Sequence, residues 1–554
     1  MAFTKLFFSV RLLCIEANFA RTVLRSYSGT LEAPACNKNE DKPKTDKTSA
    51  SGPPSRKGVV LGVYEEGEKF SLTPAAEEIN QKSGGKLCKH LNELSCELRL
   101  GKSFVVTDVV TDGGSVALAS LGPRDPPHDP QEGLDEAKEN VRVGVGAGVS
   151  CLRSRGVIDI AVDVAGHPRA AAEAAHLAAW TFQEFKSTVG RKSEVRLSAL
   201  GGDREEWSSG VVLGESQNWA RYLCDMPANV MTPAGLAQEA LDVLCPLGVQ
   251  VLVRERKWAE AQRMETFLSV ARGSCEPPLL LECHYRPEAD AHGPPVLLAA
   301  TGVTFDSGGL CLKSRTQMSE GRGCMSGAAV VLAALRALAL AKAAINVSAI
   351  IPLCENMVSG QCLKVGDVVT VLNGTRVQIE DTDMEGRLLL ADALVYGQTL
   401  LKPALVLDVA ALTQGVALAT GGGAFGCFSN SDSAWSGLRG AGAETGDRPW
   451  RLPLWAYYGR DIQADPAVDL KNRGSCTASP CVGAAFLKNF ICADWMHLDI
   501  TGVSKLAHAR APPYLDPLRM TGRPTRTLAT FLTNTAGLGA RPGSSGKLGN
   551  ETFK

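Results

Sequence analysis

The chain has 554 residues, which leaves room for more than one folded domain. Its 45% hydrophobic and 21% charged residues are typical of a globular protein. A formal net charge of -1 gives no general attraction for nucleic acid or an acidic membrane surface, so neither is expected as a partner. No uninterrupted apolar run approaches about 18 residues, so no membrane span is expected. The 17 cysteines show no metal-finger spacing and favour a reducing compartment over a disulfide framework.

Residues 1–27 have the Arg-rich, acid-poor composition of a mitochondrial transit peptide. The charged residues are Lys5, Arg11, Arg21 and Arg25 against one acid, Glu16. Arg25-Ser26-Tyr27, followed by Ser28, resembles a matrix-processing site. Arg11 interrupts the apolar core that a secretory signal needs, and an uncleaved first helix is the other alternative. We therefore expect the mitochondrial matrix, or the cytoplasm if this segment is not a transit peptide.

The next residues, 28–56, are predicted to form a flexible linker. They are largely polar and rich in Lys and Pro, so they bury too little apolar surface to offset the entropy of ordering. At the other end, the Gly- and Ser-rich residues 537–554 are predicted to form a loose tail. Two folded domains, 57–209 and 210–536, are expected between these segments.

The N-terminal domain alternates between short strands and helices, which predicts a small α/β domain. The expected strands are Val59–Tyr64, Ser103–Val110, Ser115–Leu121 and Val157–Val162. The expected helices are Pro74–Glu93, Gln131–Gly148 and Pro168–Phe185.

The C-terminal domain is predicted to be a larger α/β domain with a central sheet. Its expected strands are Leu279–His284, Val296–Ala300, Val347–Leu353 and Ala404–Val409, with a helix at Ser326–Ala341. The strand Ala404–Val409 is a continuous apolar run, as in strands buried on both faces. Asn373-Gly374 predicts a hairpin turn. Because sites in such sheets gather at the carboxyl ends of strands, Asp306 and Asp383 are well placed for chemistry.

Two acidic motifs indicate a metal site. The segment DTDMEGR brings Asp381, Asp383 and Glu385 within five residues, and such close carboxylates repel unless a cation neutralises them or their pKa rises. An acidic surface turn is the plainer alternative, but apolar residues flank the motif. Asp306 lies in an equally apolar stretch before a Gly-Gly turn. Oxygen ligands of this kind suit Mn²⁺, Mg²⁺ or Zn²⁺, and Lys313 could polarise a carbonyl beside them.

These motifs resemble those of the leucyl (cytosol) aminopeptidase family of dinuclear metallopeptidases, whose signatures are NTDAEGR and GITFDSGG. The resemblance extends from Lys57 to about Asn534 and includes the segments KGVVLGVYE, MPANVMTP and MTGRPTRT. It implies a small N-terminal α/β domain, a larger C-terminal α/β catalytic-type domain with a central mixed sheet, and a homo-hexamer whose active sites face an interior cavity.

The resemblance also implies roles for five residues. Asp306, Asp383 and Glu385 match metal ligands, and Lys313 matches the catalytic lysine. Arg387 matches the arginine that holds a bicarbonate acting as general base. The implied cofactors are therefore a divalent metal, Mn or Zn, with bicarbonate at Arg387.

Several positions depart from the family pattern. Active members carry a lysine five residues before Asp306 and an aspartate eighteen residues after it, both bound to the same metal; this chain has Thr301 and Cys324 there. Threonine is too short to replace a lysine amine, and a cysteine thiolate would shift the preference toward Zn.

Three further departures crowd the same site. Gly321 replaces a methionine that shapes the pocket for the first substrate side chain. Gln414 stands where a glycine lets the substrate backbone approach, and Asp381 replaces the asparagine of the NTD motif.

The sequence therefore supports three hypotheses. The first is a leucyl-aminopeptidase homologue of lost or much reduced activity that serves as a hexameric structural protein in mitochondria, because insect sperm leucyl aminopeptidases resemble it most in the combination of transit peptide and altered ligands. It could also assemble with paralogues. The second is an active metal-dependent aminopeptidase acting on peptides. The third is a module that binds peptides or metal without hydrolysis.

Overall fold

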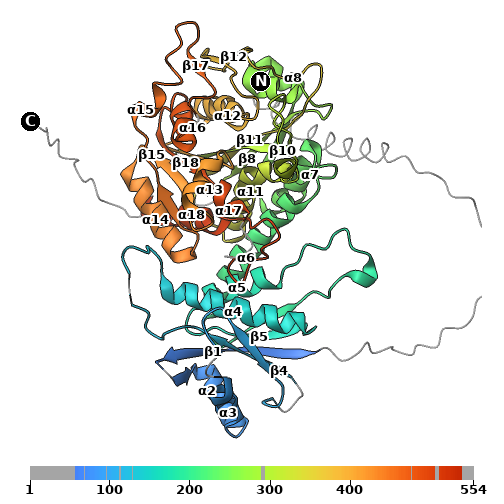
Figure 1. Ribbon diagram of the computed structural model, residues 1–554, viewed down its shortest axis with the longest axis vertical. Helices are drawn as coiled ribbons and strands as arrows, with labels where there is room; N and C mark the ends of the chain where they lie inside the picture. The colour runs from blue at the N-terminus through green and yellow to red at the C-terminus, as the bar shows by residue number, and fades with distance from the viewer. Residues whose placement is uncertain are drawn as a thin grey trace, which may run out of the picture. The chain divides into compact units, whose positions relative to one another are not determined.

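The computed structural model describes residues 56–67, 69–94, 97–110, 114–127, 129–287, 294–475, 477–505 and 511–539 (Figure 1). The predicted transit peptide 1–27 lies outside the described residues, as does the predicted linker apart from Arg56. At the other end, the last helix α18 (Thr525–Gly539) contains the first residues of the predicted tail, and residues 540–554 are not described.

The N-terminal domain is built on a six-stranded mixed sheet with the order β3-β4-β1-β5-β6, and β2 pairs with β1. Its strands are β1 (Lys57–Glu66), β2 (Lys69–Leu72), β3 (Ser103–Val106), β4 (Ser115–Ser120), β5 (Asp159–Asp163) and β6 (Arg196–Leu200). Its helices are α2 (Pro74–Lys82), α3 (Lys86–Leu94), α4 (Glu136–Ser154) and α5 (Pro168–Ala179). The expected mixed α/β domain is confirmed.

One predicted helix of this domain is wrong. The stretch Pro74–Glu93 forms two helices, α2 and α3, because Gly84 and Gly85 both have positive φ, 70° and 85°. Successive left-handed residues cannot continue an α-helix, and glycine adopts this conformation without steric cost.

The C-terminal domain contains a nine-stranded mixed sheet with the order β16-β15-β18-β14-β9-β11-β8-β7, and β10 pairs with β11. The strands are β7 (Gln250–Glu255), β8 (Leu279–Tyr285), β9 (Val296–Ala300), β10 (Gly302–Asp306), β11 (Val347–Asn356), β14 (Leu405–Ala410), β15 (Phe425–Ser429), β16 (Pro449–Arg451) and β18 (Asp494–Asp499). The same domain also contains a three-stranded sheet, formed by β12 (Val368–Thr370), β13 (Arg376–Gln378) and β17 (Leu470–Lys471). The predicted turn at Asn373-Gly374 joins β12 to β13.

The large sheet is buried on both faces, as the apolar run of β14 predicts. Leu407 and Val409 belong to one hydrophobic core, whereas Val406 and Ala410 belong to the other. Helix α11 (Ser326–Leu340) packs into the first core and α12 (Gly386–Leu401) into the second. The DTDMEGR motif runs into the first turn of α12, and Asp306 ends β10. The carboxylates of the two motifs approach within 4.8 Å, so the fold brings both motifs together.

The remaining helices connect these elements. They are α6 (Arg204–Asp225), α7 (Pro233–Leu244), α8 (Arg256–Gln262), α9 (Glu265–Ala271), α10 (Arg315–Met318), α13 (Gln414–Thr420), α14 (Asp432–Thr445), α15 (Ala456–Gly459), α16 (Ser479–Lys488) and α17 (Thr501–Ser504). Short 3₁₀ turns are η1 (Thr188–Gly190), η2 (Cys245–Leu247) and η3 (Gly321–Met325).

One helical stretch, Gly321–Leu340, is long and apolar enough to cross a membrane by length and composition alone. Its most apolar window is 72% buried within the protein, as in the core helix of a globular domain. This stretch includes α11, whose side chains fill the first core of the large sheet. The absence of a membrane span remains an expectation from the sequence.

A buried ion-pair network joins the two domains. Glu173 of α5 accepts hydrogen bonds from Arg142 Nε at 2.8 Å and from Arg526 Nη1 of α18 at 2.6 Å. Arg526 also pairs with Asp447 at 3.4 Å, and Arg142 donates to the carbonyl of Glu444 at 2.6 Å. The Glu173 side chain is fully buried, so its charge depends on these arginines.

We predict that Glu173→Gln lowers the free energy of unfolding by about 3–5 kcal/mol at neutral pH, because it removes the buried carboxylate charge that Arg142 and Arg526 share. Burial alone would raise the pKa of Glu173, but Arg142, Arg526 and Arg169 lower it from 4.5 to about 2. The difference between wild type and variant is therefore complete above pH 4.5 and shrinks as the pH falls toward 2. Urea unfolding at several pH values measures it.

The matched control is Glu78→Gln, which breaks the exposed pair with Lys82. This change should leave the free energy of unfolding almost unchanged, because solvent screens an exposed ion pair. Equal effects of the two substitutions would contradict the importance of the buried network.

Candidate metal centre

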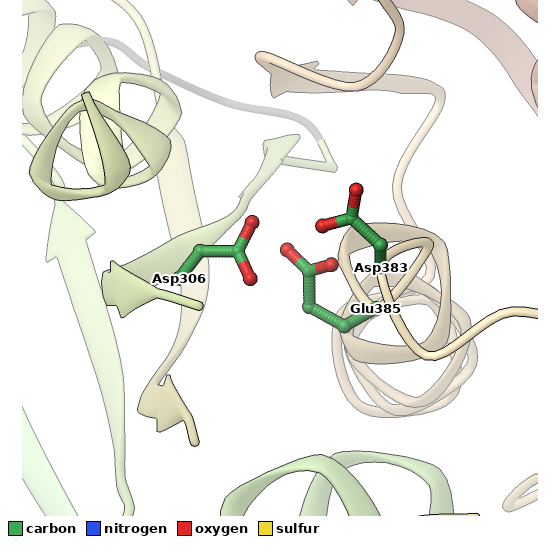
Figure 2. A group of neighbouring side chains, drawn as sticks. All are labelled: Asp306, Asp383 and Glu385. Atoms are coloured by element: carbon green, nitrogen blue, oxygen red, sulfur yellow. The ribbon is translucent and has the colours of Figure 1, made fainter. Parts of the chain in front are cut away.

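Three carboxylates converge at the edge of the large sheet (Figure 2). Asp306 ends β10, while Asp383 and Glu385 lie in the turn that leads into α12. One oxygen from each lies within 4.8 Å of the other two, and Asp306 and Glu385 are buried. Figure 2 shows Asp306 reaching from its strand toward the two acids of the facing turn. The structure thus brings together the three residues that the sequence proposes as metal ligands.

The Lys313 ammonium group lies among these carboxylates. Its Nζ is 2.8 Å from Asp306 Oδ2 and also contacts Asp383 Oδ1. Burial alone would lower the pKa of Lys313, but Asp306 and Glu385 raise it above its usual value. The side chain is therefore a fixed positive charge that faces both acidic motifs.

One ammonium group does not balance three carboxylates. Burial, together with Asp306, raises the pKa of Glu385 well above its usual value. Burial also raises the pKa of Asp383 to about 6, against the lowering effect of its hydrogen bond with Lys313. A divalent cation would remove the same excess of negative charge, and carboxylate oxygens are ligands for Mn²⁺, Mg²⁺ and Zn²⁺. These residues fit one such ion.

Thr301 does not extend the ligand group. It lies between β9 and β10, where its carbonyl accepts a hydrogen bond from Ala328 N–H at 3.1 Å. Its buried side chain lies against the first residues of the two core helices. A Cβ atom added at Gly327 would be 3.1 Å from Thr301 Oγ1, and one at Gly386 would be 3.3 Å from Thr301 Cγ2. Thr301 thus fills the space between α11 and α12.

Cys324, in η3, contacts the metal centre directly. Its thiol donates a hydrogen bond to Asp306 Oδ2 over 3.4 Å. Burial and the charges of Asp306 and Glu385 raise the pKa of this thiol well above its usual range. Of the two altered ligand positions, Cys324 therefore contacts one of the acids with a potential donor atom, whereas Thr301 lies against Gly327 and Gly386.

A cavity of about 710 Å³ opens beside the acids. Gly321 and Gln414 both line it, so the two altered pocket positions lie where the sequence places them. A Cβ atom at Gly321 would lie 2.6 Å from the carbonyl oxygen of Asp306, so a larger residue there requires the backbone of η3 to move. Gln414 is the first residue of α13.

Arg387 also lines this cavity from the first turn of α12. Its Nη1 donates to the carbonyl of Asn472 at 2.7 Å, whereas Nε is buried without a hydrogen-bond partner among the described residues. Burial lowers the pKa of Arg387 to about 10, although Glu385 and Asp381 oppose this shift. A buried guanidinium with an unused donor suits an anion, which is the role expected for bicarbonate.

The sequence did not identify the residues that orient the acids. Asn356 Nδ2 donates to Asp306 Oδ1 at 2.9 Å and to the carbonyl of Thr382 at 3.1 Å. Arg473 Nη1 lies 2.9 Å from Asp381 Oδ2 and neutralises the extra acid of DTDMEGR. Asn356 is the last residue of β11, so its position at a strand end was the available signal.

The geometry agrees with comparisons to known proteins. The description "Cytosol aminopeptidase family, catalytic domain" matches residues 218–529, and the N-terminal domain of the same family matches residues 60–188. The human cytosol aminopeptidase is 40% identical over 484 residues, which cover 86% of this chain and 92% of that protein. A probable cytosol aminopeptidase of Chromobacterium violaceum is 34% identical, covering 84% and 92% of the two chains.

Solved structures give the same result. The bottromycin maturation enzyme BotP superposes with a TM-score of 0.75 at 27% identity, over 87% of this chain and all (100%) of that one. A second BotP structure, in complex with Mn, gives a TM-score of 0.73 at 28% identity over 86% and 99% of the chains. A tomato leucine aminopeptidase mutant shares the fold, with a TM-score of 0.74 at 24% identity over 90% and 98%. Both domains of this chain match the family, and its identity to the human relative extends over 92% of that protein. The chain therefore belongs to the cytosol aminopeptidase family.

Proposed function

We propose that this chain is a cytosol aminopeptidase homologue of lost or much reduced peptidase activity. The observation that carries the proposal is the replacement of two ligand positions, Thr301 and Cys324, beside acids that are otherwise in place. The Thr301 side chain is packed against the starts of two helices, and the Cys324 thiol is hydrogen-bonded to Asp306. Thr301 thus leaves a second metal without one ligand, and Cys324 offers sulfur where the family offers a carboxylate.

The remaining acids account for a single metal. Asp306, Asp383 and Glu385 would hold it, with manganese or zinc as the proposed ion. Such an ion polarises a carbonyl and lowers the pKa of bound water. Lys313 keeps a positive charge beside the same acids, which supports orientation of a carbonyl group. Two metals could activate water and clamp the carbonyl together, but this chain lacks a complete set of ligands for a second metal.

The proposed role of the protein is structural. The protein would form a homo-hexamer in the mitochondrial matrix and could also assemble with paralogues. Such a role would explain why the fold is kept although some metal ligands are not. The supporting features are the basic segment 1–27 and the likeness to insect sperm leucyl aminopeptidases. If residues 1–27 do not direct import, the same assembly would lie in the cytoplasm.

The alternative is an active aminopeptidase with an altered centre. In its favour, Lys313, Arg387 and the three acids all line or adjoin one open cavity. A second alternative, binding of peptides or metal without hydrolysis, follows from the same cavity if catalysis alone is lost.

The first prediction of the proposed function concerns turnover. The purified chain with added Mn²⁺, Co²⁺ or Zn²⁺ should hydrolyse leucine p-nitroanilide at least ~100-fold more slowly than the human cytosol aminopeptidase. Loss of one metal removes several kcal/mol of transition-state stabilisation, and each ~1.4 kcal/mol is tenfold in rate. Comparable rates that a chelator abolishes would establish the active alternative. Tight binding of the uncleaved peptide Leu-Gly-Gly would instead favour the binding module.

The second prediction concerns restoration. The double variant Thr301→Lys, Cys324→Asp should raise kcat/KM by at least ~10-fold over wild type, because it returns the family's ligand types to the centre. Each single change should give less, because each restores one ligand only. Gln414→Gly in the double variant tests whether this side chain also hinders substrate.

A suitable control adds Lys313→Ala to the double variant, which should remove the gained activity. Thermal unfolding of every variant shows whether the protein still folds. A rate equal to that of wild type in the folded double variant, and in the double variant that also carries Gln414→Gly, would contradict the proposal that these positions limit catalysis.

The third prediction concerns processing and assembly. Protein recovered from mitochondria should begin at Ser28 by N-terminal sequencing. Its sedimentation mass should correspond to that of the homo-hexamer that the family resemblance implies. Protein that keeps residues 1–27, or that sediments as a monomer, would contradict the mitochondrial hexamer.

A further inference from the structure

A buried carboxylate without a hydrogen-bond partner lies behind one side of the cavity. Asp225 is the last residue of α6, and its side chain is only 1% exposed. Neither of its oxygens has a hydrogen-bond partner among the described residues. A carboxylate in this place also faces the negative end of the helix dipole. Its charged form is therefore unfavourable unless neighbouring groups compensate the charge.

The two arginines within 4 Å compensate this charge only in part. Arg322 Nη2 lies 3.5 Å from Asp225 Oδ1, and Arg519 Nη1 lies 3.9 Å from the same oxygen. A charge-assisted hydrogen bond is about 2.7–2.9 Å long, so neither arginine reaches the carboxylate. Both guanidinium groups are partly exposed, so water screens their charges. The Met520 N–H also faces the carboxylate, but it lacks hydrogen-bond geometry.

The two arginines belong to segments that form one side of the cavity. Arg322 lies within η3, and Arg519 directly precedes Met520. These segments contribute the cavity-lining residues Gly321, Gly323, Cys324 and Met520. They also pack on one another, because a Cβ atom at Gly323 would lie 3.1 Å from Met520 Cε. We call η3 and residues 519–520 the cavity wall. Movement of this wall away from α6 would bring the buried carboxylate into contact with water.

We propose that Asp225 is a positioning residue that opposes closure of the cavity wall while it is ionised and permits closure when it is neutral. Burial raises the pKa of Asp225 to about 6, although Arg519, Arg322, the Met520 backbone and Arg221 oppose this rise. When the wall opens, water solvates the carboxyl group and its pKa falls toward the usual 3.8. The closed wall thus binds the proton more tightly, so a lower pH favours closure.

The opposite role would be that of an anchor, in which the ionised carboxylate attracts Arg322 and Arg519 and so keeps the wall closed. The observed distances favour the first role, because neither arginine makes a hydrogen bond with the acid. The buried Cys224 thiol beside Asp225 contributes to neither role, because burial raises its pKa well above the usual value and keeps it neutral. The two roles predict opposite effects of pH on the wall.

Hydrogen–deuterium exchange of the full-length chain measures opening of the wall. One reporter is the Gly323 N–H, which donates to the carbonyl of Glu320 at 2.8 Å. The other is the Thr521 N–H, which donates to the carbonyl of Ser504 at 2.9 Å. The exchange rates are corrected for the intrinsic rate at each pH.

Asp225→Asn removes the ionisable group and separates its effect from that of the other acids of the cavity. Relative to this variant, opening in wild type should become about tenfold rarer between about pH 7.5 and about pH 5, given a carboxyl pKa of about 6 in the closed wall and 3.8 in the open wall. Opening of wild type that increases relative to the variant as the pH falls, or identical profiles of the two proteins, would overturn the proposal.

The matched control is Asp242→Asn, which removes an exposed acid of α7 and should keep the wild-type profile. A control that loses the pH dependence as Asp225→Asn does would also overturn the assignment to Asp225.

A second set of changes keeps the proposal testable if Asp225→Asn does not fold. Arg322→Gln combined with Arg519→Gln removes two partly exposed cations that lower the pKa of Asp225. The midpoint of the pH profile should therefore move to higher pH in this double variant. An unmoved midpoint, or a midpoint at lower pH, would overturn the proposal.

These measurements do not depend on turnover, so their outcome is separate from that of the proposed function. Chelator-sensitive hydrolysis equal to that of the human relative would overturn the proposed function and leave the role of Asp225 unchanged. A pH profile that does not depend on Asp225 would overturn this inference and leave the proposed function standing.

Discussion

Mutual repulsion among three carboxylates, two of them buried, is the constraint on which the candidate centre depends. Asp306, Asp383 and Glu385 approach within 4.8 Å, and Lys313 is the cation that contacts two of them. The turn at Gly308-Gly309 makes this possible, because both glycines have positive φ and the chain returns so that Lys313 N–H bonds the carbonyl of Ser307 at 3.0 Å. A lysine only seven residues after Asp306 can therefore face it.

The departures from the family pattern change this balance. Cysteine at position 324 removes a negative charge relative to aspartate, whereas threonine at 301 changes no charge, because a lysine amine bound to a metal is neutral. The additional acid Asp381 is paired with Arg473 at 2.9 Å. The three carboxylates of the centre still outnumber the one ammonium group of Lys313, so an excess of negative charge remains that a bound cation would remove.

Much of this arrangement could be predicted from the chain alone. The apolar run of β14, the turn at Asn373-Gly374 and the convergence of Asp306 with Asp383 all follow from local pattern and from the behaviour of strand ends. The split between α2 and α3 was missed because helical periodicity outweighed two glycines. Partnerships such as Asn356 with Asp306 join residues 50 positions apart, and only the pairing of β10 with β11 defines them.

We propose that the altered centre, with Asp306, Asp383 and Glu385 as its ligands, holds at most one metal ion per chain. Metal content per chain tests it most directly. The purified full-length protein is equilibrated with excess Mn²⁺ or Zn²⁺, freed of unbound ions, and analysed by inductively coupled plasma mass spectrometry, with Asp306→Asn to correct for ions bound elsewhere. The account predicts a difference of no more than one ion per chain between wild type and this variant. A difference of two ions per chain would contradict it.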